Sequence, residues 1–487
     1  MSADGEILSA LRYCAGEGRC LPRTAPAQLH ADRVLSQLGA TVDWTNVELD
    51  PGDSDTSLWA SSGAMALSGQ AELPDLPPAP VASAMSGAAW ALSALAGAPA
   101  DLDGPALLGE RAAHYRYSRR GRVSVSGSAR LMKLSDGELA VNLPRHSDWE
   151  LVPAWLEAKD STLAAAELSK ADEKDDSAWA SLASQLRHQS CDALVSRARL
   201  MGMAVSQAKS RETVTEWCQI ERWRSAADRV SGDSIALARP VVLDLSALWA
   251  GPLAAQLLLS HGARVIKVES ESRPDGARLG DAGFFRLLNG GKRSCAVDLG
   301  TEHGVATLTD LIKQADIVIE SSRPRALRQL GIVAEDLVRD TKGLSWISIT
   351  GYGRAMPEGE WVAFGDDAAV SAGLYTESAE GSRFCGDAIA DPLTGLHAAV
   401  AALASWRAGG GVLVDLSLAG VAGYAASLEP ARVLTIELES DPTSDCVVVD
   451  GTGYSVSEPK SREGMPTAAA LGADTAAVLR EFGIAAS

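Results

Sequence analysis

The run PVVLDL (residues 240–245) begins a series of short β-branched segments in the carboxyl-terminal half of this 487-residue chain. Further runs follow at 264–269, 294–299, 316–320, 345–350 and 412–416, and helical stretches separate most of them. Strands that alternate with helices are typical of a parallel sheet covered by helices on both faces. The sequence therefore predicts an α/β fold that binds ligands at the carboxyl ends of its strands.

Distinctive residues follow several of these predicted strands. LWAGP (248–252) comes after the first, SSRP (321–324) after the fourth and GYG (351–353) after the fifth. Because the carboxyl ends of parallel strands lie at one edge of the sheet, we expect a binding site where these segments meet.

The motif AIADPLTGLH (388–397) leads into a run of small residues at 398–405. Asp391 precedes Pro392 as an N-cap residue precedes N1, so its carboxylate is predicted at the positive end of a helix dipole, where it stays ionised. Such a carboxylate either caps the helix or attacks an activated acyl group as a nucleophile. The local pattern leaves both interpretations open.

Composition limits the possible partners. The chain has 63 acidic and 44 basic residues, a formal charge of −19, which disfavours contact with a nucleic-acid backbone. No apolar run reaches the roughly 18 residues of a membrane span, and the amino terminus lacks a signal-peptide pattern, so we expect a cytoplasmic protein without membrane contact. The seven cysteines include no C-x-x-C pair and no cluster at metal-ligand spacing, so no metal site is predicted.

The amino-terminal part repeats two later segments in the same order. ADRVLSQLGATV (31–42) resembles AAQLLLSHGARV (254–265), and PVASAMSGAA (80–89) aligns with the Asp391 motif, with Ser83 in place of the aspartate. This order suggests a duplicated domain whose first copy is shortened. The alternative is a chance likeness between alanine-rich helices. Between the copies, residues 121–127 and 129–142 are predicted as strands, the latter turned at Asp136-Gly137.

The carboxyl-terminal half resembles the family III CoA transferases, a group that includes the α-methylacyl-CoA racemases. The resemblance is carried in order by VLDLSALWAGPL (242–253), HGARVIKVE (261–269), NGGKRSCAVDL (289–299), SITGYG (348–353) and the Asp391 motif. It implies a Rossmann-like large domain with a smaller α+β domain, and two chains interlocked as a dimer.

The domain order expected here departs from that plan. Residues 1–105 are predicted to be a shortened, degenerate copy of the large domain, 106–235 the small domain, and 236–487 a complete large domain with its tail. We therefore expect a fused pseudo-dimer or a homodimer.

The resemblance also implies the chemistry. Asp391 would attack the thioester of an acyl-CoA, and a carboxylate acceptor would exchange through anhydride and aspartyl-CoA intermediates. Coenzyme A thioester is then a substrate, and no permanently bound cofactor is expected. The same match places seven residues near the CoA nucleotide: Leu248, Trp249, Lys292, Arg293, Arg323, Ala326 and Arg328.

Two alternatives remain. An α-methylacyl-CoA racemase or epimerase would need a histidine base where this chain has Asp366. A non-catalytic CoA-binding protein is the other, because the family usually carries an arginine at the position of Gln329.

Overall fold

The computed structural model describes residues 11–14, 25–43, 54–97, 102–157, 171–172, 174–223, 239–428, 436–437, 446–449 and 451–485. Within them, the largest sheet has seven strands. Their order across the sheet is β11 (Arg293–Val297), β10 (Arg264–Ser270), β9 (Val241–Asp244), β12 (Ile317–Glu320), β13 (Ser345–Thr350), β16 (Val412–Ser417) and β8 (Gln219–Arg222). The first six pair in parallel, and β8 adds antiparallel to β16. The predicted α/β fold and its strand series are confirmed.

Successive residues of these strands enter two different cores. Val242, Ile317 and Ile347 face helices α9 (Ala250–Ser260), α15 (Ala390–Arg407) and α16 (Leu418–Ala426). Leu243 and Val318 face the opposite layer, which contains α11 (Glu302–Lys313), α13 (Ala334–Asp340) and α17 (Thr475–Glu481). Alternation with period two therefore buries both faces of the sheet.

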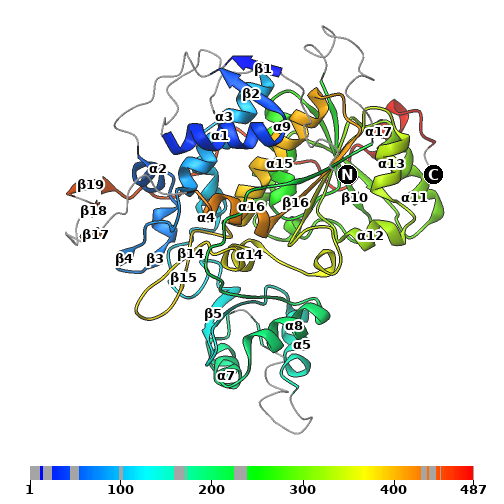
Figure 1. The fold of residues 1–487 in the computed structure, drawn as a ribbon. Coiled ribbons are helices and arrows are strands. Elements are labelled where there is room, and N and C mark those ends of the chain that lie inside the picture. The colour runs from blue at the N-terminus through cyan, green and yellow to red at the C-terminus, as the bar shows by residue number, and fades with distance from the viewer. Residues whose placement is uncertain are drawn as a thin grey trace.

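A smaller α+β unit projects from the rest of the molecule (Figure 1). Its antiparallel sheet contains β5 (Ala129–Lys133), β6 (Glu138–Asn142) and β7 (Ala204–Gln207), and its helices are α5 (His146–Trp155), α7 (Asp176–Leu186) and α8 (Cys191–Met201). The hairpin turned at Asp136-Gly137 is confirmed. Residues 121–127 form turns with one isolated bridge at Val123, so the strand predicted there is wrong.

The amino-terminal part is built from β1 (Leu11–Cys14), α1 (Ala25–Gln37), β2 (Ala40–Asp43), α2 (Asp55–Ser61), β3 (Gly69–Gln70), β4 (Leu73–Pro74), α3 (Val81–Ala96) and α4 (Glu110–Tyr115). Strands β1 and β2 pair in parallel, as β9 and β10 do. The hairpin β3–β4 precedes α3, as the hairpin of β14 (Tyr375–Thr376) and β15 (Arg383–Phe384) precedes α15. In Figure 1, α3 and α15 lie together at the centre of the molecule.

Two glycines show that these helices pack in corresponding ways. A Cβ built on Gly87 of α3 would meet the carbonyl oxygen of Ala27 in α1, and one on Gly395 of α15 would meet that of Ala250 in α9. The segment alignments of the sequence analysis pair Gly87 with Gly395 and, extended by four residues, Ala27 with Ala250. Only glycine permits this close approach of two helices.

The carboxyl-terminal segment, residues 451–485, contacts both the amino-terminal part and the large sheet. Ser457 N–H donates to the Ala60 carbonyl, and Arg462 forms a bidentate pair with the buried Glu110 of α4. Further along, Asp474 accepts a hydrogen bond from Ser294 N–H of β11. The segment therefore ties the amino-terminal part to the large sheet.

The segment 106–235, predicted as the small domain, also contains elements that contact the large domain. Residue 235 lies outside the described residues. Strand β8, within the segment 106–235 assigned to the small domain, pairs with the large sheet, and α4 contacts α10 (Ala282–Asn289).

Candidate active site

Asp391 lies in the first turn of α15, so the prediction that it is the N-cap is wrong. The helix begins at Ala390, and the N-cap residue is Ile389, which has no side-chain capping bond. Ala388 just before it takes a left-handed backbone conformation with φ of 42°, and its N–H donates to Asp366 Oδ1 at 2.9 Å. The turn at Ala388 thus sets the helix start two residues earlier than predicted, and Asp391 still lies at the positive end of the helix dipole.

Three helices direct their amino-terminal ends at the Asp391 carboxylate. Besides its own helix, backbone hydrogen bonds from Ala250 at the start of α9 and Gly365 at the start of α14 (Gly365–Ser371) favour its charged form. A Cβ on Gly365 would overlap Asp391 Oδ2, which shows how closely backbone and carboxylate approach. Such a set of N–H donors holds a carboxylate in one orientation.

Burial nevertheless raises the pKa of Asp391 to about 6, against the opposing effect of Arg111 and these backbone bonds. The expectation that the helix dipole alone keeps the group ionised is therefore incomplete, because desolvation outweighs it. With a pKa of about 6, the carboxylate is mostly anionic at pH 7. A partly desolvated anion of this kind is a stronger nucleophile than one in water.

Two further carboxylates surround Asp391. Asp387 is fully buried and pairs with Arg111, while burial raises the pKa of Asp366 to about 7. Asp366 and Asp387 each repel Asp391 electrostatically. Asp366 is the residue that the sequence analysis matched to the histidine base of a racemase, and its pKa leaves it partly protonated at neutral pH.

The topological switch point of the sheet adjoins this carboxylate cluster. The chain leaves β9 toward β10 and β11 on one side and later toward β12 and β13 on the other, so loops after β9 and β12 diverge at the carboxyl edge. Ala247 N–H donates to Ser321 Oγ at 3.0 Å across these two loops. Open α/β sheets bind their ligands at such a point.

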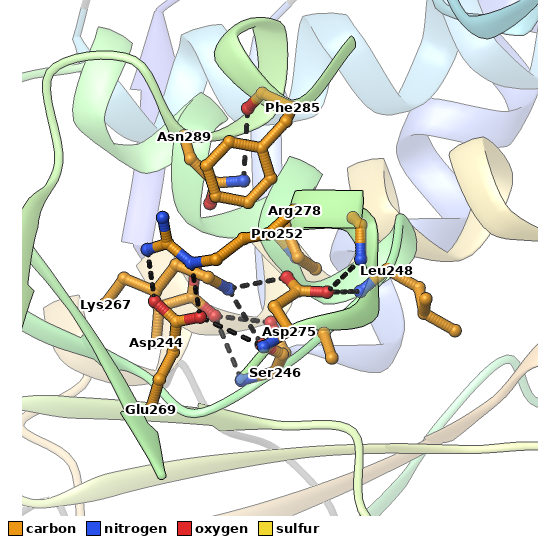
Figure 2. Close-up of polar contacts among 12 residues, drawn as sticks. Asp244, Ser246, Leu248, Pro252, Lys267, Glu269, Asp275, Arg278, Phe285 and Asn289 are labelled. Atoms are coloured by element: carbon orange, nitrogen blue, oxygen red, sulfur yellow. Dashed lines mark hydrogen bonds and ion pairs between the residues drawn. The ribbon is translucent and has the colours of Figure 1, made fainter. Parts of the chain in front are cut away.

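Leu248 is held at this edge by a buried polar network (Figure 2). Its backbone has φ of 70° and its side chain is 45% exposed. Asp275 Oδ1 accepts the N–H groups of Leu248 and Ala277 at 3.0 and 2.9 Å, while its other oxygen pairs with Lys267 at 2.9 Å. The ion pair beneath the loop thus fixes an exposed leucine at the switch point, where the sequence analysis placed it.

The structure buries Lys292, which was predicted near the CoA nucleotide, among oxygen atoms of the protein. The residue is 4% exposed, and its ammonium group donates to Asp244 Oδ2 at 2.7 Å, the Pro252 carbonyl at 2.9 Å and Asn289 Oδ1 at 3.1 Å. Burial works to raise the pKa of Asp244, but the charges of Lys292 and Lys267 lower it overall. All three ammonium hydrogens are used inside the protein, so Lys292 has none for a phosphate.

Arg293 and Trp249 are also engaged elsewhere. Arg293 pairs with Glu481 of α17 at 2.5 Å, and Arg264 pairs with the same carboxylate. The Trp249 ring is 3% exposed and lies between Phe284 at 5.4 Å and the Arg111 guanidinium at 4.9 Å. Trp249, predicted near the CoA nucleotide, is thus packed in the core, and its buried ring has no exposed face on which a base could stack.

Of the remaining predicted residues, Ala326 and Arg328 lie on α12 (Pro324–Gln329) and Arg323 is its N-cap, next to the switch point. Arg323, Ala326 and Arg328 are exposed, and Arg328 pairs with Glu335 at 2.7 Å. In the part of the chain that the structure describes, no carboxylate forms an ion pair with Arg323. Arg323 is the predicted basic residue best placed to receive an anion.

Sequence reasoning missed three arginines of this site, of which Arg145 and Arg273 are two. Partial burial and the nearby charges of Arg325, Arg145 and Arg273 lower the pKa of Arg323 against the opposing charge of Glu360, so four guanidinium groups gather between the large sheet and the small unit. Two of the four are paired within the protein, Arg325 with Glu360 at 2.9 Å and Arg145 with Asp148 at 2.6 Å. Arg323 also comes within 3.8 Å of the Cβ position at Gly202 in the small unit. The third missed residue is Arg111, from α4. No sequence pattern marks these residues, because they come from separate elements that meet only in the fold.

Part of the chain is similar to one known protein family. The family described as CoA-transferase family III matches residues 237–439. Succinyl-CoA–D-citramalate CoA-transferase of Chloroflexus aurantiacus is 32% identical over 209 residues, which cover 40% of this chain and 52% of that protein. Succinate–glutarate CoA-transferase of Agrobacterium fabrum is 30% identical over 200 residues, which cover 37% of this chain and 50% of that protein.

The crystal structure of Rv3272 from Mycobacterium tuberculosis is 33% identical over 37% of this chain and 53% of that one, with a TM-score of 0.35. The chain spans about half the length of the curated relatives that it matches. Among the described residues, no helix has both the length and the apolar character that crossing a membrane requires.

Proposed function

We propose, from the membership of residues 237–439 in CoA-transferase family III, that this protein is an acyl-CoA:carboxylate CoA-transferase with Asp391 as its nucleophile. The observation that carries the proposal is the convergence of the α9, α14 and α15 amino termini on one half-buried carboxylate at the sheet's switch point. The relatives named above act on carboxylic acids and their CoA thioesters, which agrees with this class of substrate.

The reaction proceeds in four exchanges at acyl carbons. Asp391 attacks the donor thioester, the carbon–sulfur bond breaks, and CoA thiolate leaves a mixed anhydride. The thiolate then attacks the aspartyl carbonyl and releases the donor carboxylate, which gives aspartyl-CoA. The acceptor carboxylate displaces CoA to form a second anhydride. Thiolate attack on its acyl carbonyl yields the new acyl-CoA and restores Asp391, so atoms and protons balance without a further reactant.

The CoA phosphates would bind at Arg273 and Arg323, next to Arg145 and Arg325, which also pair with Asp148 and Glu360 within the protein. Arg323 follows β12 and Arg273 follows β10, both at the carboxyl edge, while Arg145 comes from the small unit. Guanidinium groups suit phosphate because they donate in pairs. Leu248 and Ala326 would line the nucleotide from the adjoining loops. This assignment replaces Lys292, Arg293 and Trp249.

The proposed architecture is a fused pseudo-dimer with one site per chain. The matching order of elements and the equivalent glycine contacts of α1–α3 and α9–α15 support duplication. Ser83 occupies the first copy's position, and its N–H is bonded to Asp55 Oδ1 at 2.9 Å. A hydroxyl there cannot form the acid anhydride that the mechanism needs. We expect one trapped site per 50.7-kDa chain, whether the chain is a monomer or a homodimer; two would contradict the proposal.

Hydroxylamine trapping tests the nucleophile. Incubation with a panel of acyl-CoA donors should give an Asp391 hydroxamate, located by peptide mass spectrometry, and Asp391→Asn should lower kcat by about 10⁴-fold. Asp336→Asn, a surface change, is the matched control. Exchange of α-carbon deuterium without CoA transfer would indicate a racemase, and binding without either reaction a CoA-binding protein. Full turnover by Asp391→Asn would overturn the proposal.

The pH profile gives a second test. Only the anion attacks, and burial raises the pKa of Asp391 to about 6. We therefore expect kcat/KM to fall about tenfold for each pH unit below about 6, because the ionised fraction falls in that proportion. A profile flat down to pH 4.5 would contradict this reasoning.

A further inference from the structure

Arg111 is the residue whose positive charge lowers the pKa of Asp391. It lies on α4, outside the segment that matches the family. Its Nε donates to Asp387 Oδ2 at 3.0 Å, and its Nη2 pairs with Asp387 Oδ1. The guanidinium also lies on the Trp249 ring at 4.9 Å. Asp387 and Trp249 both belong to the large domain, so Arg111 bridges from the amino-terminal part into the site.

Helix α4 is itself fixed in place. The neighbouring Glu110 is buried and pairs with Arg462 through two hydrogen bonds of 2.6 and 3.0 Å. Tyr115 at the end of the helix accepts the N–H of Asp281 at 2.8 Å. These contacts hold the Arg111 backbone against the large domain.

The charge of Arg111 acts on all three carboxylates of the cluster. It pairs with Asp387 and lowers the pKa values of Asp366 and Asp391 against the effect of burial. Asp387 and Asp366 act on Asp391 in the opposite direction, and α9 contributes only the backbone N–H of Ala250. One arginine therefore acts on all three carboxyl groups of the cluster.

We propose that Arg111 is a positioning residue of the Asp391 site, which the amino-terminal part supplies to the large domain. It orients Asp387, braces Trp249 and keeps a positive charge beside the nucleophile. The amino-terminal part thus completes a site that residues 237–439 do not complete alone. This inference rests on the proposed function for its catalytic meaning, but its electrostatic content can be measured separately.

Two substitutions in the carboxylate cluster should shift the pKa of Asp391 in opposite directions. Arg111→Gln removes the balancing charge, so Asp391 should become protonated at a pH about one unit higher or more. Asp387→Asn removes a repelling carboxylate and frees the Arg111 charge, so protonation should move to lower pH. A purely structural loss would move both variants in the same direction.

The experiment measures protonation of Asp391 without relying on turnover. Carbodiimide activates protonated carboxyl groups, and the tryptic peptide 384–407 contains both Asp387 and Asp391 without an internal Lys or Arg. Labelling with carbodiimide and an amine across pH 4–9, located by fragment-ion mass spectrometry, gives the midpoint for Asp391 in the full chain. The pH profile of kcat/KM should follow the same midpoints.

Arg462→Gln is the matched control, because it breaks the ion pair with Glu110, the α4 residue next to Arg111, and Arg462 is not among the charges that shift the pKa of Asp391. Arg111→Lys keeps a cation and should retain most of the wild-type midpoint. Equal midpoints in wild type and Arg111→Gln, or equal shifts in Arg111→Gln and Arg462→Gln, would overturn the inference. If wild type labels as expected but transfers no CoA, the proposed function fails while the role of Arg111 stands.

Discussion

Replacing Lys292 with methionine separates a structural lysine from a phosphate-binding one. The ammonium group lies in the buried network of Asp244, Lys267 and Asp275, part of which Figure 2 shows, and donates to three oxygens within the protein. Methionine keeps the length of the side chain but removes the charge and every donor. The variant should therefore lose stability rather than substrate affinity.

The expected loss of stability follows from the buried groups that Lys292→Met leaves without a partner. Asp244 would keep Lys267 at 4.0 Å and the Ser246 N–H at 3.1 Å, while the Pro252 carbonyl and Asn289 Oδ1 would lose a donor. Removing one partner of a buried ion pair costs about 3–5 kcal/mol, because the other charge stays buried. We expect the free energy of unfolding to fall by about that amount.

Urea unfolding at pH 7, followed by tryptophan fluorescence, measures the change. Arg293→Gln is the matched control, since this neighbouring residue forms a surface pair with Glu481 that contributes about 0–1 kcal/mol. KM for the acyl-CoA donor should be the same in both variants. Stability within 0.5 kcal/mol of wild type, together with a roughly tenfold higher KM for Lys292→Met, would refute the structural interpretation.

Two further predictions concern other parts of the core. Gly365→Ala places a methyl group against Asp391 Oδ2 and the Ala388 carbonyl, so the carboxylate must move by about 1 Å; kcat/KM should fall about 10²-fold. Gly300→Ala, on a surface loop, should leave it unchanged. His30 and His397 lie with their Nε2 atoms 2.9 Å apart, and burial lowers both pKa values, that of His397 to about 4. Below pH 6.5 the unfolded chain binds protons that the folded chain does not, so stability falls by up to about 1.4 kcal/mol per histidine and pH unit. Replacing both with glutamine should flatten this part of the unfolding pH profile relative to wild type, whereas His188→Gln at the surface should not; an unchanged slope would contradict the assignment.

The alternation of apolar residues determined the α/β fold without reference to tertiary contacts. Val242 and Leu243 must face opposite sides of any strand, so a run apolar on both sides requires two covering layers. The hairpin turned at Asp136-Gly137 was also predictable from neighbouring residues alone, because its turn geometry depends on those two residues. The segment 121–127 has similar β propensity but gains one bridge only, since strand formation depends on a partner.

The tertiary structure alone decided which charged residues are available to a ligand. Lys292 and Arg293 are adjacent in sequence, yet one ends among buried oxygens and the other on a surface carboxylate of the tail. The same holds for the start of α15, where Asp366 binds the Ala388 N–H and moves the cap from Asp391 to Ile389. Arg111 reaches Asp387 across 276 positions of the chain. Sequence pattern records periodicity over neighbouring residues, whereas solvation and ion pairing depend on segments brought together from far apart. The sequence therefore predicted Asp391 as a candidate nucleophile but not the charges that surround it.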